Sequence, residues 1–462
     1  MQLARILLRA GKDPFTVVSP ESSLEDYPAG VFGKNVGNLV FSDSMHRILS
    51  TPDNEVLPNT FLGERDGVTP PYLANINSNF DHFVVPLANA FRTTFLPNLA
   101  LLTKTIQGLK IPVTVVGVGV SGGGGSLSKG VGDVPDELKV GVKKFVNAVL
   151  DRSATIGVRG ENTRQFLAGL GYKDDVVDVI GCPSLFRNGA DLTIEKRAAG
   201  ITPDSQFSMN VSPYVNYMGD SSLYHAKKYK NMIYIPQDLE TLRLLMWGKN
   251  PDSFSTKMPT HTGHPFYEQD RMRFFVDSRS WIDALAKLDF SFGTRIHGNI
   301  AALVARTPAV VLVHDTRTQE LAEYHEIPHR LVPDLPKRVD AADLYDEADF
   351  TAFNAGHNGR FETFTKFLDK NNIEHVFQEG KANPEYDARL AALELPGPVR
   401  RIPADQQELA GRMQWMYSQL RNNKNRDNYR FRAPVPHVRP TAPQQVGLLN
   451  RSVGRVLKRM RG

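Results

Sequence analysis

Short apolar runs rich in β-branched residues alternate with stretches of helical hydrophobic periodicity between about residues 80 and 313 of the 462-residue chain. The apolar runs predict buried strands, and the stretches between them predict amphipathic helices. Continuous apolar strands joined through helices are typical of parallel sheets that helices cover on both faces. The predicted strands are 80–85, 113–118, 155–158, 176–180, 207–211, 232–235, 273–276, 290–292 and 309–313, and the clearest helices are 135–152, 161–169 and 280–288.

This set of strands is large for one sheet, so the fold class that we predict is α/β with two Rossmann-like parallel-sheet domains. A polar stretch with glycine and proline over 188–204 predicts the boundary between them, which gives domains of 1–200 and 201–376. Residues 377–462 contain scattered prolines among arginine, asparagine and glutamine, and we expect a partly disordered extension there.

Positive charge is concentrated at the end of that extension. The whole chain carries a formal net charge of +5, but residues 398–462 hold 14 basic against 3 acidic residues, and the rest of the chain 41 against 47. A basic segment on an acidic body indicates a polyanionic partner. No nucleic acid partner is expected, because the aromatic residues of the extension are not regularly interleaved with its basic ones.

An amphipathic helix is predicted over 448–461. At 100° per residue, its apolar side chains fall on one side and its cationic side chains on the other. This pattern favours docking on an anionic membrane surface. Packing of the helix on the body of the protein or on a protein partner stays open.

Neither a signal peptide nor a membrane-spanning segment is expected. Arg5 and Arg9 interrupt the apolar run at the N-terminus, and no stretch of about 18 apolar residues occurs. The single cysteine, Cys182, cannot form an internal disulfide, which fits a reducing compartment. We therefore expect a cytoplasmic protein, peripheral at the inner face of the membrane if its terminal helix docks there.

The segment 288–318 carries the most chemistry. Residues 289–292 predict a buried strand and 296–306 a helix, so Arg295 lies in the turn between them and His297 in the first helical turn. In open parallel sheets, ligands bind beyond the carboxyl ends of the strands, where helix N-termini favour anions. An arginine there suits a phosphate or carboxylate, and a histidine beside it can exchange a proton near neutral pH. Equally, both side chains could simply cap or solvate the turn.

This segment resembles the signature of the polysaccharide pyruvyl transferase family. The turn Arg295-Ile296-His297-Gly298, the dipeptide Thr307-Pro308, the strand 309–313 and the loop His314-Asp315-Thr316-Arg317 stand in the family's order. Three further stretches are similar to family motifs, namely 33–38 with Asn38 at a usual aspartate, 157–163 with Arg159, and 181–184 with Cys182 at a common aspartate. The resemblance extends over about residues 28–370.

The resemblance implies a GT-B-like fold, in which two Rossmann-like domains face each other across a cleft. It also implies phosphoenolpyruvate as the donor, without a separate cofactor, and a saccharide diol as the acceptor, lipid-linked if the protein works at a membrane. The product is then a cyclic pyruvate ketal in polysaccharide or envelope glycan synthesis.

The resemblance also assigns roles to residues. His297 is the implied acid or base, Arg295 holds the anionic groups of the donor, and Arg159 is a second anion clamp. Asp315 follows a predicted strand and either orients acceptor hydroxyls or is an ordinary strand-end aspartate. The remaining substrate-binding residues so implied are Asn35, Gly37, Asn38 and Gly298.

Two other patterns point to different chemistry. Residues 117–122 fit the GxGxxG spacing of dinucleotide sites, but a glycine- and serine-rich sequence continues before a helix begins near 135, so we expect a flexible loop lining the cleft. His261 and His264 lack a third ligand at recognisable spacing, so we predict surface histidines and no metal site. The alternatives to a pyruvyl transferase are a GT-B glycosyltransferase that uses a nucleotide sugar and a non-catalytic saccharide- or membrane-binding scaffold.

Overall fold

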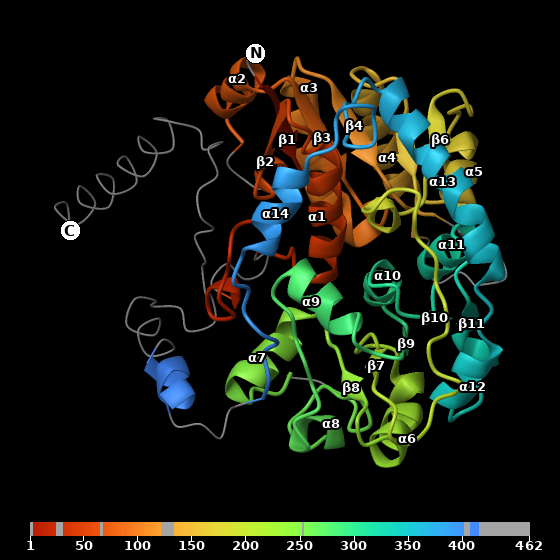
Figure 1. Cartoon of the computed structure of the whole chain (residues 1–462). Helices are drawn as coiled ribbons and strands as arrows, with labels where there is room; N and C mark the ends of the chain where they lie inside the picture. Colours follow the sequence, from red (N-terminus) through yellow and green to blue (C-terminus); the bar gives the residue numbers. More distant parts are fainter. Residues whose placement is uncertain are drawn as a thin grey trace.

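The computed structural model describes residues 3–24, 31–64, 68–121, 134–251, 254–401 and 407–414. Over these residues the chain forms two main parallel sheets surrounded by helices, one above the other in Figure 1. The predicted α/β class with two parallel sheets is therefore confirmed. The amphipathic helix predicted over 448–461 lies outside the described residues. Within the described ranges, no helix is both long and apolar enough to span a lipid bilayer.

The first sheet is built from the N-terminal part of the chain. Its strands pair in the order β2-β1-β3-β4, and a parallel bridge between Val118 and Val158 links β4 to the pair β5-β6. The strands are β1 (Ala4–Leu8), β2 (Asn54–Pro58), β3 (His82–Pro86), β4 (Val113–Val116), β5 (Ile156–Val158) and β6 (Val177–Val179). The helices are α1 (Gly37–Leu49), α2 (Pro70–Asn79), α3 (Leu96–Gly108), α4 (Asp136–Leu150) and α5 (Glu161–Gly169).

The second sheet follows in the sequence and has the order β11-β10-β9-β7-β8. Its strands are β7 (Phe207–Asn210), β8 (Ile233–Tyr234), β9 (Phe290–Gly293), β10 (Ala309–Val313) and β11 (His329–Leu331). Its helices are α6 (Gly219–Lys228), α7 (Leu239–Trp247), α8 (Pro265–Glu268), α9 (Ser278–Leu285), α10 (Ile296–Val304), α11 (Thr316–Tyr324) and α12 (Ala341–Glu347).

After the second sheet the chain returns to the first. α13 (Thr351–Lys370) packs Phe364 and Phe367 into the core that β1 forms with the second half of α1. α14 (Pro384–Ala391), which the apolar pattern does not predict, is joined to α1 by an ion pair between Arg47 and Asp387 (2.8 Å). Both helices lie beside the upper sheet in Figure 1.

α1 connects the two halves. Leu39 and Phe41 in its first half belong to the core of the second sheet, whereas Met45 and Ile48 in its second half pack with β1 of the first sheet. A helix with apolar contacts on nearly all sides is held between the bodies that it touches. The N-terminus of α1 thereby lies against α10, where the two parallel-sheet halves meet.

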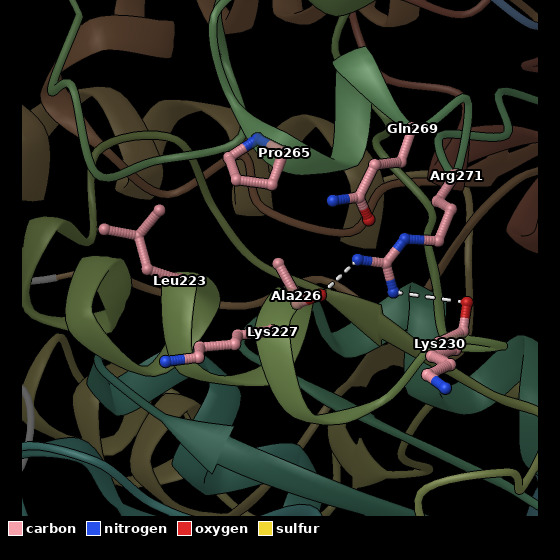
Figure 2. Close-up of a pocket in the computed structure, with 7 residues that line it drawn as sticks. All are labelled: Leu223, Ala226, Lys227, Lys230, Pro265, Gln269 and Arg271. Atoms are coloured by element: carbon pink, nitrogen blue, oxygen red, sulfur yellow. Dashed lines mark hydrogen bonds between the residues drawn. The ribbon is translucent and has the colours of Figure 1, made fainter.

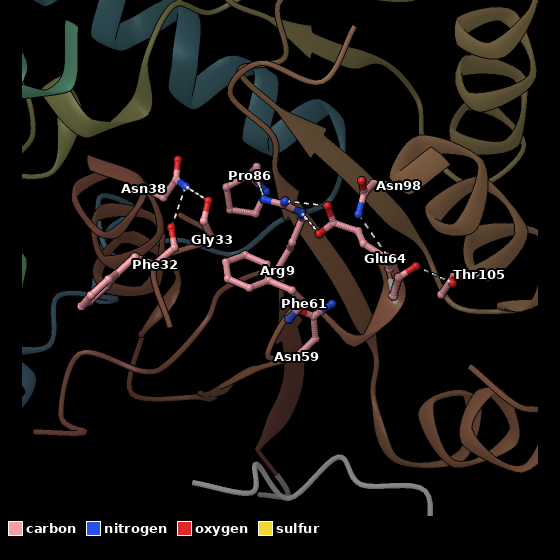
Figure 3. Close-up of polar contacts among 11 residues, drawn as sticks. Arg9, Phe32, Gly33, Asn38, Asn59, Phe61, Glu64, Pro86, Asn98 and Thr105 are labelled. Carbon is pink, nitrogen blue, oxygen red and sulfur yellow. Dashed lines mark hydrogen bonds and ion pairs between the residues drawn. The ribbon is translucent and has the colours of Figure 1, made fainter. Parts of the chain in front are cut away.

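The apolar pattern misses β1, β2 and β11, and it wrongly predicts a strand over 273–276, where Phe274 forms an isolated bridge instead. β1 escapes prediction because Arg5 and Arg9 interrupt its apolar run. Arg9 forms two hydrogen bonds with Glu64 (2.6 and 2.8 Å), a carboxylate that is 5% exposed (Figure 3). Such charge-assisted pairing allows an arginine at the end of a buried strand.

The prediction that His261 and His264 lie on the surface is wrong. His264 is fully buried, and its Nδ1 accepts a hydrogen bond from the backbone N–H of Phe266 at the start of α8 (3.1 Å). His261 Nε2 lies 3.0 Å from the carbonyl oxygen of Thr256. Both rings therefore hold local backbone in place, which sequence spacing does not reveal. Among the residues that the structure describes, no three His, Cys, Asp or Glu side chains come together in a way that could hold a metal ion.

Candidate functional site

The carboxyl end of β9 leads into α10 through a tight turn. Gly293 has a φ of +153°, and a Cβ there would lie 1.8 Å from the carbonyl oxygen of Asn210, so glycine is required. Asn299 Nδ2 donates to the carbonyl oxygens of Gly293 (2.9 Å) and Arg295 (3.1 Å). Asn210 Oδ1 accepts from the backbone N–H of Arg295 (3.2 Å). The turn is fixed from both sides, which places Arg295 immediately before the first residue of α10.

The guanidinium of Arg295 uses only part of its hydrogen-bonding capacity. It forms an ion pair with Asp238, which follows β8, and it lies 6.0 Å from the ring centroid of Tyr214. Its Nε is buried without a hydrogen-bond partner in the described part of the chain. Burial alone would lower the pKa of Arg295, but the charge and hydrogen bond of Asp238, together with Tyr214 and Tyr234, more than offset this and raise it. Arg295 is thus a fixed cation whose buried Nε is an unused donor.

His297 lies in the first turn of α10 and faces the first half of the molecule. The ring stacks on Phe41 of α1, with ring centroids 6.0 Å apart and planes at 26°. Burial lowers the pKa of His297 to about 3, and the positive charge of Arg159 adds to this effect. At physiological pH the unliganded protein therefore carries a neutral imidazole at His297. This ring can accept a proton as a base, but it is not protonated and so cannot donate one as an imidazolium.

The loop before α1 meets this motif. Asn35 Oδ1 accepts from the backbone N–H of Gly37 (2.8 Å), and a Cβ on Gly37 would lie 3.0 Å from the Cβ of His297. Asn38 instead donates from its amide to the carbonyl oxygen of Phe32 (2.8 Å), as Figure 3 shows. Of the three predicted loop residues, Asn35 and Gly37 lie beside the motif, whereas Asn38 holds its own loop together.

Arg159 follows β5 and reaches the same region from the first sheet. It is 4% exposed, its Nε is buried, and its guanidinium makes no hydrogen bond with a described residue. The side chain crosses directly over Gly119, where a Cβ would lie 2.2 Å from Arg159 Nε. Burial lowers the pKa of Arg159 to about 10, so the group stays charged at neutral pH. A buried cation without hydrogen-bond acceptors is costly, and an anionic ligand would supply them.

The other two predicted residues have contacts that explain them structurally. A Cβ on Gly298 would lie 2.6 Å from Gln237 Nε2, so glycine allows α10 to approach this side chain. Asp315 caps α11, because its Oδ1 accepts from the backbone N–H (2.8 Å) and the hydroxyl (2.7 Å) of Thr318. Its Oδ2 is paired with Arg317. With both oxygens occupied, the geometry favours a strand-end helix cap over an aspartate that orients acceptor hydroxyls.

Several polar side chains near these residues were not predicted. Tyr214 and Asp238 follow β7 and β8, so the strand-end rule that selects Arg295 would have selected them too. Glu320 lies inside α11, where sequence position gives no such signal. Its carboxylate accepts from the backbone N–H of Thr163 at the start of α5 (2.6 Å) and therefore joins the two halves. Burial raises the pKa of Glu320 to about 7.

A cavity of about 570 Å³ lies elsewhere in the second half, beside α6 and α8 (Figure 2). It is lined by Leu223, Ala226, Lys227, Lys230, Pro265, Gln269 and Arg271. Arg271 donates to the carbonyl oxygens of Ala226 and Tyr229 and so fastens the C-terminal end of α6. None of the residues predicted for the site lines this cavity.

Comparison with known proteins gives two findings. The model of the polysaccharide pyruvyl transferase family matches residues 35–316, more than half of the chain. Similar solved structures include a UDP-N-acetylglucosamine 2-epimerase (13% identity, 86% of this chain and 99% of that chain, TM-score 0.40). Others are the UDP-GlcNAc 2-epimerase from Neisseria meningitidis bound to UDP-GlcNAc (12%, 85% and 100%, 0.37) and the glycotransferase of kitacinnamycin (12%, 81% and 100%, 0.35). No curated protein matches the chain.

Proposed function

Because this chain belongs to the polysaccharide pyruvyl transferase family, we propose that it transfers a pyruvyl group from phosphoenolpyruvate to two hydroxyls of a saccharide, which gives a cyclic ketal. The observation that carries the proposal is the position of Arg159, a buried guanidinium without hydrogen bonds to described residues, close enough to His297 to lower its pKa. The unpaired guanidinium can bind an anionic donor, and the neutral imidazole beside it can take up a proton. The proposed reaction uses no cofactor besides the donor.

The proposed chemistry balances without an oxidant or a reductant. A proton adds to the methylene carbon of the enol, and one saccharide hydroxyl attacks the cationic carbon that results and loses its proton. The bond between this carbon and the phosphate oxygen then breaks, and the second hydroxyl closes the ring and loses its proton. The products are the ketal and inorganic phosphate. The protein therefore has two tasks, to hold anionic groups and to move protons.

The two arginines serve the first task from opposite sheets. Arg159 offers a complete guanidinium, whereas Arg295 offers its unused Nε while Asp238 fixes its orientation. Each charge-assisted hydrogen bond to the donor contributes on the order of 1.5–3 kcal/mol. The contacts of Asn35 and Gly37 support a role in shaping the wall of the donor site beside His297.

His297 serves the second task. In the unliganded protein its neutral ring can act as the base that takes a proton from an acceptor hydroxyl. A donor anion beside Arg159 would offset the positive charge that lowers the pKa of His297, so donor binding should raise this pKa. We expect the His297 ring resonances in an NMR titration to move to a higher pKa when phosphoenolpyruvate is present. An unchanged midpoint would contradict the placement of the donor beside this ring.

The decisive experiment measures inorganic phosphate released from phosphoenolpyruvate in the presence of saccharides that carry a free diol. We expect release that depends on the acceptor, together with a ketal in the product detected by mass spectrometry. Transfer that instead requires a nucleotide sugar would replace the proposal with glycosyl transfer. Absence of turnover with both donors would indicate a binding scaffold.

A further inference from the structure

Two arginines, of which Arg317 ends the motif loop 314–317, meet from opposite halves of the molecule. Arg92 lies in the loop that follows β3, and Arg317 lies in the first turn of α11. The side-chain oxygen of Asn89 accepts a hydrogen bond from Arg92 Nη1 (2.7 Å) and another from Arg317 Nη1. The amide orientation is assigned from this pattern of donors. A single neutral oxygen thus joins two guanidinium groups across the junction of the sheets.

The positive charge at this junction is not matched by acids. Arg317 is paired with Asp315, but Arg92 has no carboxylate partner among the described residues. Arg92 Nε is buried without a hydrogen bond in the same part of the chain. Burial lowers the pKa of Arg92, and the like charge of Arg317 lowers it further, which shows that the two cations repel one another.

The pair also adjoins the proposed donor site. The charge of Arg317 acts on Arg159 as well as on Arg92, so Arg317 lies near both of the other arginines. Arg317 is still accessible, with 24% of its side chain exposed. Arg92, Arg159 and Arg317 supply three positive charges here. Of the acids beside them, Asp315 is paired with Arg317, and burial raises the pKa of Glu320. The cluster therefore keeps a net positive charge at neutral pH.

We propose that Arg92 and Arg317 form a subsite for a phosphate group of the substrate, with the phosphate replacing Asn89 as their shared hydrogen-bond acceptor. A phosphate has several acceptor oxygens and a negative charge, so it can satisfy both guanidiniums and remove their repulsion, which one amide oxygen cannot do. This inference rests on the proposed function and deepens it. The phosphate is either that of the donor or one carried by the acceptor.

The test compares binding of phosphoenolpyruvate and of inorganic pyrophosphate by isothermal titration calorimetry in the full-length wild type and in Arg92→Gln. If the donor supplies the phosphate, Arg92→Gln should bind phosphoenolpyruvate at least about tenfold more weakly. If the acceptor supplies it, phosphoenolpyruvate binding should stay unchanged while pyrophosphate binding weakens by a similar factor. Unchanged binding of both anions, or no binding of either to the wild type, would overturn the subsite.

Two further variants separate the subsite from other effects. Arg306→Gln removes the same charge from an exposed residue paired with Asp191 and should leave both affinities unchanged. Arg92→Lys keeps the charge but loses the planar donor pair, and it should recover part of the affinity. Thermal unfolding of each variant checks the fold.

The subsite and the proposed function can fail separately. Loss of anion binding in Arg92→Gln together with no phosphate release by the wild type would leave the subsite standing and reject pyruvyl transfer. If the wild type turns over phosphoenolpyruvate and Arg92→Gln does so with unchanged KM values, pyruvyl transfer would stand and the subsite would be rejected.

Discussion

At the scale of single residues, the environment of His297 decides what the side chain can do. Its ring touches Phe41 and lies near the positive charge of Arg159, and no described residue accepts or donates a hydrogen bond to it. A ring without structural hydrogen bonds is available for proton transfer and contributes little polar stabilisation to the fold.

We therefore expect His297→Ala to abolish ketal formation while lowering the free energy of unfolding by no more than about 1–2 kcal/mol, from lost packing on Phe41. The measurements are phosphate release from phosphoenolpyruvate and denaturant unfolding. Phe41→Leu is the matched control, because it removes the stacking contact and keeps the imidazole, so most activity should remain. Near-wild-type turnover by His297→Ala would remove this residue from the mechanism.

At the scale of elements, the segment after β4 determines where Arg159 can lie. The Arg159 side chain passes over the backbone of Gly119, and a Cβ at that position would lie 2.4 Å from Arg159 Cδ and closer still to Nε. The GxGxxG spacing at 117–122 therefore has at least one structural reason, which is the close approach of the Arg159 side chain to Gly119.

We predict that Gly119→Ala displaces Arg159 and raises the KM for phosphoenolpyruvate about tenfold or more. Gly169→Ala at the end of α5 is the control, since nothing lies within 4 Å of the added Cβ. Steady-state kinetics on both variants, with unfolding curves to compare their stabilities, distinguishes displacement of the arginine from general destabilisation. Equal KM values for the two variants would count against the placement of Arg159 in the donor site.

At the scale of the whole molecule, the two halves are joined by buried contacts that include a titrating carboxyl. Glu320 of α11 accepts from the backbone N–H of Thr163, which lies in α5 of the first half. Burial raises its pKa from 4.5 to about 7, and Arg159 only partly offsets this. The folded protein therefore holds a proton that the unfolded chain releases between these two pH values.

It follows that Glu320 lowers the free energy of unfolding as pH rises from about 4.5 to about 7, by on the order of 3 kcal/mol. Glu320→Gln keeps an acceptor oxygen for Thr163 but does not titrate, so its stability should fall less over this range. Unfolding midpoints in guanidinium chloride at pH 5 and pH 7.5 test this. Glu379→Gln, an exposed change outside α11, should behave like the wild type; the same slope in all three proteins would contradict the buried titration.

The basic extension gives a prediction at the same scale. We propose that the amphipathic segment 448–461 docks on anionic membranes, because its cationic and apolar side chains separate on a helix. Deletion of residues 445–462 should release the protein from liposomes that contain phosphatidylglycerol, and added salt should weaken binding of the full chain. Unchanged sedimentation with liposomes after the deletion would reject this role.

Prediction from sequence succeeded where the signal was local. The apolar runs located β7, β9 and β10, and the periodicity of 161–169 gave the bounds of α5. It failed where a distant partner was needed, as in β1, whose arginines look incompatible with a buried strand until Glu55 and Glu64 are brought beside them. α14 likewise depends on contacts with α1 that lie far away in the sequence.

For the candidate site, the sequence by itself determined that Arg159, Arg295 and His297 stand at the ends of strands and the starts of helices, because strand and helix periodicity depends on neighbouring residues. Only the tertiary structure decided their chemical state. It pairs Arg295 with Asp238, leaves the guanidinium of Arg159 without hydrogen bonds to described residues, and makes the imidazole of His297 neutral. Burial and Coulomb interaction depend on distance in space, and the groups that set them are far apart along the chain.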